Sequence, residues 1–499
     1  MSLVRSIFTV GGYTLVSRVL GLVRDLLTAA LLGAGPMADA FFVAFRLPNL
    51  FRRLFAEGAF AAAFVPMFAR TLEADGPEAA RRFAEQALSV LVAALIVLTV
   101  VAELAMPWLV LVLAPGFADE PEKFALAVEF SRITFPYLLF VAAMALMAGV
   151  LNGLYRFGAA AAAPIVLNLC MIVALFTLSD VAGSPGHALS WGVAAAGIGQ
   201  CLLLMVALRN AGMALRPTLP RITPQIRRLL ALIAPGALGA GVMQINLLVG
   251  TMIASLLPTG AVAYLYYADR LYQLPLGVIG IAVGTALLPR LSRELRAGEL
   301  RAAAHTTNRS IEVALLLTLP ASAALLVLAT PIVSVLFERG AFTAVDTAET
   351  ARTLAAYAVG LPAFVLVKVL APAFFAREDT RTPVIVAAWT VAANIVFSVL
   401  LVFPFGHVGL ALATSAASWI NAGWLAIGLS RRGFLAADDR LLRALPRLLL
   451  ATTVMTALLA AAGWPLADAM HGGSLAGAGL LAGLCAGGAV AFFAAAFAA

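Results

Sequence analysis

Long apolar stretches separated by short polar loops run through the whole chain of 499 residues. Each stretch covers roughly 20–28 residues, the length at which an α-helix crosses the hydrocarbon core of a bilayer. We therefore predict an all-α polytopic membrane protein with 14 transmembrane helices. The expected spans are 9–32, 37–64, 86–114, 130–151, 159–179, 188–208, 229–257, 262–289, 312–337, 352–376, 384–405, 407–429, 446–467 and 474–497.

The positive charges of the loops alternate from one side of these spans to the other. Most loop arginines fall before span 1 or after the even-numbered spans, whereas the opposite loops carry only Lys123, Arg339 and Arg352. Because cytoplasmic loops are enriched in lysine and arginine, both termini are expected in the cytoplasm. Charges within the first 30 residues also favour a retained first span over a cleaved signal peptide.

A weak internal repeat relates the two halves of the chain at an offset of about 224 residues. Phe64-Val65-Pro66 resembles Leu287-Leu288-Pro289, and the prolines at 107 and 136 have counterparts at 331 and 362, as Asn168 has in Asn394. Six spans in each half predict two lobes related by a pseudo-two-fold axis along the membrane normal. The expected domains are 1–220 with spans 1–6, 221–440 with spans 7–12, and 441–499 with two additional helices.

Composition supports a membrane protein and argues against several other classes. Hydrophobic residues make up 63% of the chain and charged residues 12%, with a mean hydropathy of +1.01. The net charge of +8 is explained by basic cytoplasmic loops, so no nucleic-acid partner is expected. Cys170, Cys201 and Cys485 lie in apolar segments, which disfavours a disulfide framework or a metal cluster. No enzyme motif or ATP-binding domain is present, so we expect a transporter without a metal or cofactor.

Charged residues nevertheless interrupt the first two spans and span 8. A charge near the bilayer centre costs about 2.5–3.5 kcal/mol on insertion scales, so such residues normally serve a function. The arginine guanidinium binds phosphate oxygens in a bidentate manner and stays charged when partly desolvated. The pattern therefore predicts a hydrated cavity that binds an anion such as a pyrophosphate. The candidate residues are Arg18, Arg24, Asp25, Asp39, Arg52, Arg53, Glu57, Asp269 and Arg270.

Helical spacing suggests how these residues share faces. Arg18 and Asp25 are seven residues apart and lie on one face, from which Arg24 is expected to point away. Asp39, Arg46 and Arg53 recur every seven residues, with Arg52 on another side. An alternative is that Arg46 and Arg53 form internal ion pairs with Asp39 and Glu57. In the cavity interpretation the acids hold the arginines in place or contribute to gating.

The motifs around these charges resemble those of the MurJ/MviN family of bacterial lipid II flippases, in the multidrug/oligosaccharidyl-lipid/polysaccharide exporter superfamily. The likeness extends over all 14 predicted spans and is strongest in residues 14–70 and 264–290. The motifs that carry it are Ser17-Arg18-Val19-Leu20-Gly21-Leu22-Val23-Arg24-Asp25, Ala38-Asp39-Ala40-Phe41 and Arg46-Leu47-Pro48-Asn49-Leu50-Phe51-Arg52-Arg53-Leu54-Phe55-Ala56-Glu57-Gly58-Ala59.

The resemblance implies two six-helix lobes around a cationic cavity, and a groove on spans 13 and 14 for a polyprenyl tail. It implies that lipid II, an undecaprenyl-pyrophosphate-linked peptidoglycan precursor, is moved from the inner to the outer leaflet by alternating access. Carried over by motif, Arg18, Arg24, Arg52, Arg270 and Asn49 are expected to bind substrate. Asp25, Asp39, Arg53, Glu57 and Asp269 are expected in supporting or gating roles. Membrane lipids and the cell-wall synthesis machinery are the expected partners of a monomer.

One departure and several alternatives remain at this point. Some relatives appear to bind sodium through acidic residues on spans 7 and 11, but residues 229–257 and 384–405 here contain neither Asp nor Glu. Drive by membrane potential or protons is therefore the better hypothesis. Export of another polyprenyl-linked oligosaccharide, such as an O-antigen unit, is the closest alternative function. A drug exporter, a membrane enzyme or a cell-wall scaffold fits the embedded arginines less well.

Overall fold

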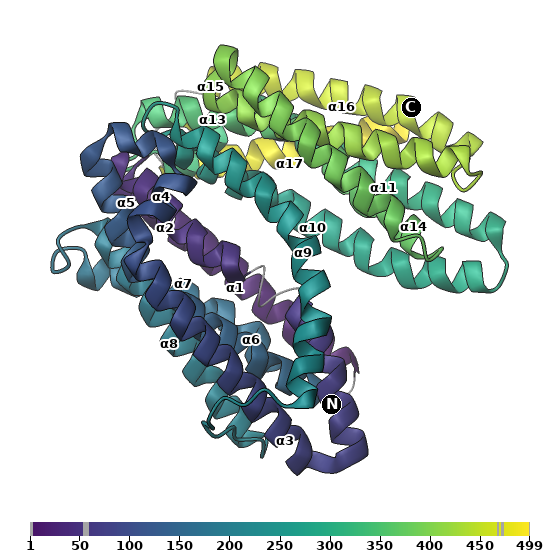
Figure 1. Cartoon of the computed structure of the whole chain (residues 1–499). Coiled ribbons are helices and arrows are strands. Elements are labelled where there is room, and N and C mark those ends of the chain that lie inside the picture. The colour runs from purple at the N-terminus through teal and green to yellow at the C-terminus, as the bar shows by residue number, and fades with distance from the viewer. Residues whose placement is uncertain (1–2, 53–58, 467–468, 471–473, 499) are drawn as a thin grey trace. The chain divides into compact units, whose positions relative to one another are not determined.

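The computed structural model describes residues 3–52, 59–466, 469–470 and 474–498, and these residues form helices joined by short connections (Figure 1). The chain divides into two compact units, Met1–Thr259 and Gly260–Ala499. The first unit contains α1 (Leu3–Leu32), α2 (Pro36–Arg52), α3 (Ala59–Leu104), α4 (Met106–Leu113), the 3₁₀-helix η2 (Pro115–Asp119), α5 (Pro121–Thr134), α6 (Tyr137–Gly153), α7 (Gly158–Leu178), α8 (Pro185–Asn210) and α9 (Pro224–Ser255).

The second unit is also helical throughout its described residues. It contains α10 (Ala261–Arg296), α11 (Leu300–Val327), α12 (Ala329–Phe337), α13 (Ala344–Ala358), α14 (Leu361–Phe375), α15 (Arg381–Arg431), α16 (Asp439–Leu466) and α17 (Leu475–Ala498). The all-helical prediction is confirmed for the described part of the chain.

Nine helices among the described residues are long and apolar enough to cross a membrane. Some of these contain breaks, so the number of crossings is not the number of helices. The 51 residues of α15 would extend about 75 Å as one helix, more than twice the hydrocarbon thickness. Gly406 breaks α15 with φ 57° and ψ −133°, between the predicted spans 384–405 and 407–429. The total of 14 spans and their pseudo-symmetry stay predictions.

Close packing at that break depends on a second glycine. A Cβ atom built on Gly409 would lie 2.1 Å from the carbonyl oxygen of Leu401, so only a residue without a side chain fits there. Gly76 breaks α3 in a comparable way, with φ 84° and ψ 176°. The two helical parts of α3 correspond to the end of predicted span 2 and to span 3.

The core of the first unit is aromatic where the two helical parts of α3, before and after Gly76, face each other. The rings of Phe64 and Phe83 stack with centroids 5.5 Å apart, and Phe68 stacks on Phe64. Helix α6 packs on this stack through glycines, because a Cβ on Gly153 would lie 2.7 Å from the Phe68 ring. Small residues let apolar helices approach closely where no hydrophobic effect drives them together.

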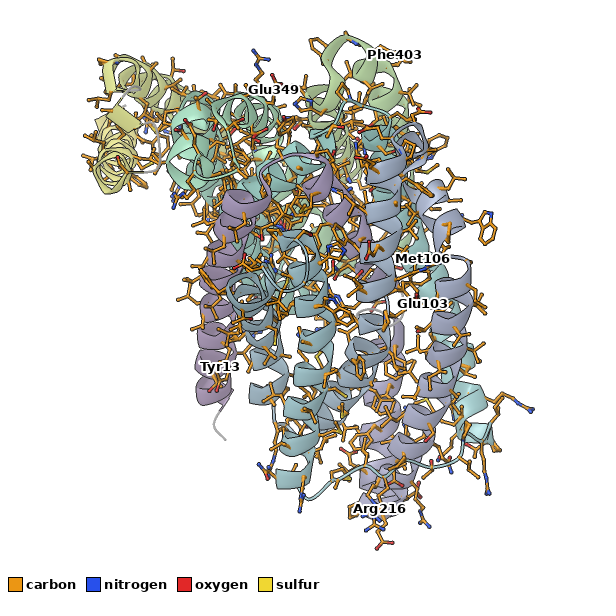
Figure 2. All side chains as sticks on the ribbon, turned by 90° about the vertical axis from the view of Figure 1, so that its left-hand side faces the viewer. Tyr13, Glu103, Met106, Arg216, Glu349 and Phe403 are labelled. Carbon is orange, nitrogen blue, oxygen red and sulfur yellow. The ribbon has the colours of Figure 1, made fainter. Side chains whose placement is uncertain are left out.

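The segment that joins α8 to α9 is fastened to α3 by hydrogen bonds. The backbone N–H of Arg216 donates to Glu85 Oε1 at 2.9 Å, and that of Thr218 donates to Ser89 Oγ at 3.3 Å. Figure 2 shows Arg216 at one end of the first unit, and Glu103 near the end of α3 and Met106 at the beginning of α4 lie well away from it. Helix α9 packs against α3, α4 and η2. The predicted lobe boundary at 220/221 would assign α9 to the second lobe, and this boundary stays a prediction.

Candidate functional site

Arg24 and Asp25 in α1 are buried side by side, with 7% and 5% of their surface exposed. Two guanidinium nitrogens of Arg24 bond one carboxylate oxygen of Asp25, Nη2 at 2.6 Å and Nε at 3.1 Å. The expectation that Arg24 points away from the face of Asp25 was wrong. Because an arginine side chain is long and flexible, it folds back along the helix to its own neighbour and neutralises it.

Asn168 in α7 completes the surroundings of this pair. Arg24 Nη1 donates to Asn168 Oδ1 at 2.9 Å, and Asn168 Nδ2 donates to the backbone carbonyl of Ser17 at 2.9 Å. Helix α7 packs along α1, which brings these residues together although they are far apart in sequence. Asn168 was noticed in the sequence only as a marker of the repeat, and no local signal identifies it as a partner of Arg24.

The arginines of α2 bond polar groups. Arg52 Nε donates to Asn49 Oδ1 at 3.1 Å, and Asn49 Nδ2 donates to the carbonyl of Phe45 at 2.8 Å. Arg46 Nη1 donates to Thr251 Oγ1 of α9 at 2.6 Å, and Thr251 is fully buried. The structure thus connects the predicted arginine stripe of α2 to α9.

Other candidates lie apart from these contacts or beyond the description. Arg18 is exposed on α1. Arg53 and Glu57 lie outside the described residues. Asp269 and Arg270 are half-buried on α10 in the second unit, where Gln273 bonds Asp269 and the Arg270 guanidinium lies 4.7 Å from the Tyr266 ring centroid. A common site for the four predicted substrate arginines stays a prediction.

Asp39 belongs to a different group of contacts, which we call the Lys123 cluster: Asp39, Phe117, Glu120, Lys123 and Thr259. Lys123 Nζ lies 3.5 Å from Asp39 Oδ2, and these two side chains are only 2% and 1% exposed. The ammonium also bonds Glu120 at 3.0 Å and Thr259 at 3.1 Å, and lies 4.4 Å from the Phe117 ring centroid. A buried charge of this kind requires several partners at once.

The Lys123 cluster connects the beginning of α5 to the chain just after α9. Thr259 Oγ1 donates to Glu120 at about 3 Å. Although burial raises it, hydrogen bonds from Lys123 and Thr259 and the charge of Lys123 hold the pKa of Glu120 below its ordinary value. Sequence analysis placed Lys123 in a loop as a single positive charge. Its burial depends on the packing of α5 against α2, whose first turn carries Asp39.

A close backbone contact lies next to this cluster. The N–H of Gly116 donates to Ser255 Oγ at 3.2 Å, and a Cβ on Gly116 would lie 2.1 Å from the Ser255 carbonyl oxygen. Only glycine therefore permits η2 to approach the last turn of α9 this closely. Together with the Lys123 cluster, this contact holds α9 against η2 and α5.

A potential metal site was sought among the acidic, histidine and cysteine side chains. Within the described ranges, no three of these side chains lie close enough to hold a metal ion.

Comparison with known proteins gives a consistent match along the chain. A family model described as "Lipid II flippase MurJ" matches residues 28–476. A protein of Rhizobium meliloti (strain 1021) named "Probable lipid II flippase MurJ" is 52% identical over 463 residues, covering 92% of this chain and 86% of that protein. The "Lipid II flippase MurJ" of Burkholderia cenocepacia is 37% identical over 463 residues, covering 92% and 90%.

Solved structures give the same result. The structure titled "Lipid II flippase MurJ, inward closed conformation" aligns with a TM-score of 0.81 at 25% identity, covering 97% of both chains. An inward-facing multidrug transporter of the MATE family in the MOP superfamily aligns with a TM-score of 0.68 at 15% identity, covering 83% of this chain and 95% of that one. The second likeness concerns the fold alone.

Proposed function

Because the chain belongs to the lipid II flippase MurJ family, a family of transporters in the MOP superfamily, we propose that it moves lipid II across the inner membrane. The supporting observation is the match to named flippases along more than nine-tenths of the chain, including the helices that carry the arginines. The substrate would be an undecaprenyl-pyrophosphate-linked peptidoglycan precursor, delivered to the outer leaflet for cell-wall synthesis.

Binding of the pyrophosphate is assigned to Arg18, Arg24, Arg52 and Arg270, with Asn49 orienting Arg52. The contact between Asn49 and Arg52 supports the last point. Guanidinium groups suit a diphosphate because each presents paired N–H donors to the oxygens. Binding must be moderate, since a transporter that holds its cargo too tightly does not release it.

Asp25 acts in this proposal as the counter-ion that the substrate replaces. It neutralises Arg24 in the structure, so a pyrophosphate must displace the carboxylate or bind beside it. Exchange of one anion for another avoids leaving Arg24 as an uncompensated buried charge. The acids Asp39, Glu57 and Asp269 and the basic Arg53 stay in the supporting and gating roles that the resemblance implies.

Transport by alternating access requires a contact that opens on one side of the membrane. We assign that role to the Lys123 cluster and the Gly116–Ser255 contact, which hold α9 to η2 and α5. Glu120 and Lys123 fall in the predicted connection between spans 3 and 4, which carries few positive charges, and this predicts that the contact faces away from the cytoplasm. With both termini in the cytoplasm, it would close the outer side and separate when substrate leaves.

A direct test measures lipid II exposed in the outer leaflet of cells that depend on this protein. Depletion should abolish exposure, and an intact copy should restore it. Arg24→Ala and Arg52→Ala should fail to restore exposure or growth at normal protein level, whereas Arg227→Ala, an exposed arginine of α9, should restore both. Normal exposure with Arg24→Ala and Arg52→Ala would contradict the binding roles.

The same assay distinguishes lipid II from the closest alternative substrate, another polyprenyl-linked oligosaccharide. It also tests whether the membrane potential drives transport. If cells accumulated a different polyprenyl-linked oligosaccharide while lipid II exposure stayed normal, the substrate assignment would be wrong. Collapse of the membrane potential should stop exposure if the potential drives transport.

The proposed outer contact is tested by cross-linking in a background without Cys170, Cys201 and Cys485. Glu120→Cys and Thr259→Cys, joined by a short bifunctional thiol reagent, should stop lipid II exposure, and reduction should restore it. The matched control joins Glu120→Cys to Phe124→Cys within one segment and should leave transport unchanged. Continued transport with the first pair fully linked would show that this contact does not open.

A further inference from the structure

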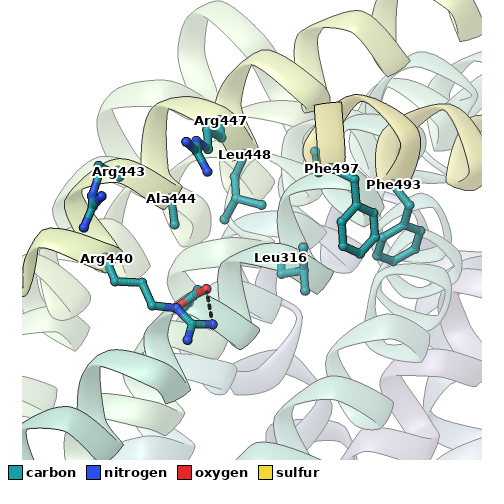
Figure 3. Close-up of a pocket in the computed structure, with 10 residues that line it drawn as sticks. Leu316, Arg440, Arg443, Ala444, Arg447, Leu448, Phe493 and Phe497 are labelled. Atoms are coloured by element: carbon teal, nitrogen blue, oxygen red, sulfur yellow. Dashed lines mark hydrogen bonds and ion pairs between the residues drawn. The ribbon is translucent and has the colours of Figure 1, made fainter. Parts of the chain in front are cut away.

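A pocket of about 500 Å³ lies in the second unit between α11, α16 and α17 (Figure 3), and its lining includes none of the residues assigned to pyrophosphate binding or gating. Arg440, Arg443 and Arg447 line it from α16. Their spacing of three and four residues places all three on one face of the helix, so three guanidinium groups border the same space. We call this space the α16 pocket.

The positive charge of the α16 pocket is only partly neutralised. Glu312 of α11 bonds Arg440 at 3.2 Å, and it also pairs with Arg309 outside the pocket. Arg443 donates to the backbone carbonyl of Asp439 at 3.0 Å. Over the described ranges, no carboxylate lies within ion-pair distance of Arg443 or Arg447. One acid against three arginines leaves a net positive site suited to an anion.

The opposite side of the α16 pocket is apolar. Phe493 and Phe497 of α17 lie next to each other at its edge, and Leu316 and Leu448 add aliphatic surface (Figure 3). Phe497 is 89% exposed, which places an aromatic ring where lipid would surround it. A small soluble anion would make no favourable contact with this apolar surface. A molecule with a charged head group and a hydrocarbon tail would contact both the basic and the apolar side of the pocket.

The position along α16 fits the depth of a lipid head group. Arg447 lies eight residues after Asp439, about 12 Å along the helix axis from its beginning. The arginine bias of the loops predicts that this end faces the cytoplasm. Basic pockets between transmembrane helices on that side are suited to anionic lipid head groups.

We propose that the α16 pocket binds an anionic glycerophospholipid of the inner leaflet. Arg443 and Arg447 contact the phosphate, and the acyl chains lie along Phe493 and Phe497. The site would hold a resident bilayer lipid, so its occupancy is independent of whether the protein flips lipid II. Glu312 competes with the phosphate for Arg440 and sets the affinity.

The experiment counts lipids bound to the purified full-length chain by native mass spectrometry. The probes are phosphatidylglycerol and phosphatidylcholine with identical acyl chains. Phosphatidylglycerol should bind more tightly, and Arg443→Gln with Arg447→Gln should weaken it by about tenfold or more without changing phosphatidylcholine. The matched control, Arg227→Gln with Arg228→Gln, removes two exposed arginines from α9 and should change the affinity less than twofold.

A variant that is expected to bind phosphatidylglycerol more tightly distinguishes a lost binding site from a misfolded protein. Glu312→Gln removes the competing carboxylate, so phosphatidylglycerol should bind several-fold more tightly. An unfolded protein does not gain affinity. An unchanged or lower affinity for this variant would contradict the proposal.

Three further outcomes would overturn the proposal that the α16 pocket binds an anionic glycerophospholipid. Equal binding of the two lipids, or an equal loss in the control pair, would indicate non-specific charge attraction. Competition by glycerol 3-phosphate as strong as that by the lipid would indicate a soluble anion. Preferential binding of undecaprenyl pyrophosphate, lost with the Arg443 and Arg447 changes, would assign the pocket to the transported substrate.

Discussion

The ion pairs of the two units differ in how deeply they are buried. In the first unit, Arg24–Asp25 and Lys123–Asp39 are ion pairs in which each side chain is less than a tenth exposed. In the second unit, the pairs that fasten α11 to the beginning of α16 are partly exposed, as in Arg309 with Asp438 at 2.5 Å. The exposed fractions of those two side chains are 19% and 32%.

This difference in burial indicates in which unit the desolvation of charged groups costs the most free energy. Desolvation of a buried ion pair commonly offsets its Coulombic attraction, so such pairs persist where position or switching depends on them. Partly exposed pairs cost little to form and contribute little to stability. We therefore expect charge changes in the first unit to have large effects and those in the second unit to have small ones.

The largest effect is expected from removing one partner of the Lys123 cluster. Lys123→Met leaves Asp39 buried without its cation, and breaking a buried pair in this way typically costs about 3–5 kcal/mol. The measurement is thermal or denaturant unfolding of the purified protein in detergent. Adding Asp39→Leu should recover much of the loss, since the carboxylate that paired with Lys123 is then removed as well. A double variant as unstable as the single one would contradict a direct interaction.

A smaller but substantial effect is expected at Gly116. In Gly116→Ala the new Cβ meets the Ser255 carbonyl at 2.1 Å, so η2 must move away from α9. Overpacking of this kind costs about 1–3 kcal/mol. Hydrogen exchange of η2 should increase more than that of α7, which does not touch it. Gly35→Ala serves as a control because no atom lies within 4 Å of a Cβ there. Equal effects of the two changes would argue against the contact.

An intermediate loss is expected for Asn168→Leu. The variant removes the acceptor of Arg24 Nη1 and the donor to the Ser17 carbonyl, which leaves buried polar groups unsatisfied at about 1–3 kcal/mol. Asn394→Leu, the counterpart of Asn168 in the repeat, probes the second unit. If the comparison holds, Asn168→Leu should also lower lipid II exposure at normal protein level, and Asn394→Leu should not. A reversed order would contradict a special role for the Arg24 surroundings.

The smallest effect is expected from acidification of the loop between α14 and α15. Hydrogen bonds from Thr382 and then from Arg432 lower the pKa of Asp379 to about 2. A carboxyl whose pKa is lowered by folding stabilises the protein above its unfolded pKa near 4, and this contribution is lost as the pH falls toward 2. Because Asp379 is close to solvent, Asp379→Asn should alter the stability between pH 5 and pH 2 only slightly. A large change would show that the ion pairs of the second unit contribute substantially to the stability of the protein.

Much of the fold followed from the sequence because apolar length and helical periodicity are local properties. The break at Gly406 lies between two predicted spans, as the pattern of residues 384–429 suggested. The breaks near Ala105 and Phe135 were not predicted, since a short helix such as α4 continues the same apolar run. Hydropathy indicates how long an apolar segment is, but it does not show where the helix axis changes direction within that segment.

The candidate site was predicted less completely. The sequence identified Arg24 and Asp25 as embedded charges but placed them on different faces, because helical spacing ignores the reach of an arginine side chain. It assigned Lys123 to a loop, although packing of α5 against α2 buries this side chain almost fully. Asn168 and Thr251 carried no signal, because their importance comes from neighbours that are distant in the chain.

The sequence by itself determined the helical membrane fold, the embedded arginines and, through specific motifs, the family. These features depend on residue type and local spacing, which are written along the chain. Only the tertiary structure decided which charges meet, because packing of α1 on α7 and of η2 on α9 sets the distances between their side chains. It also placed Arg443 and Arg447 beside Phe493 and Phe497, since a pocket forms only when three helices converge.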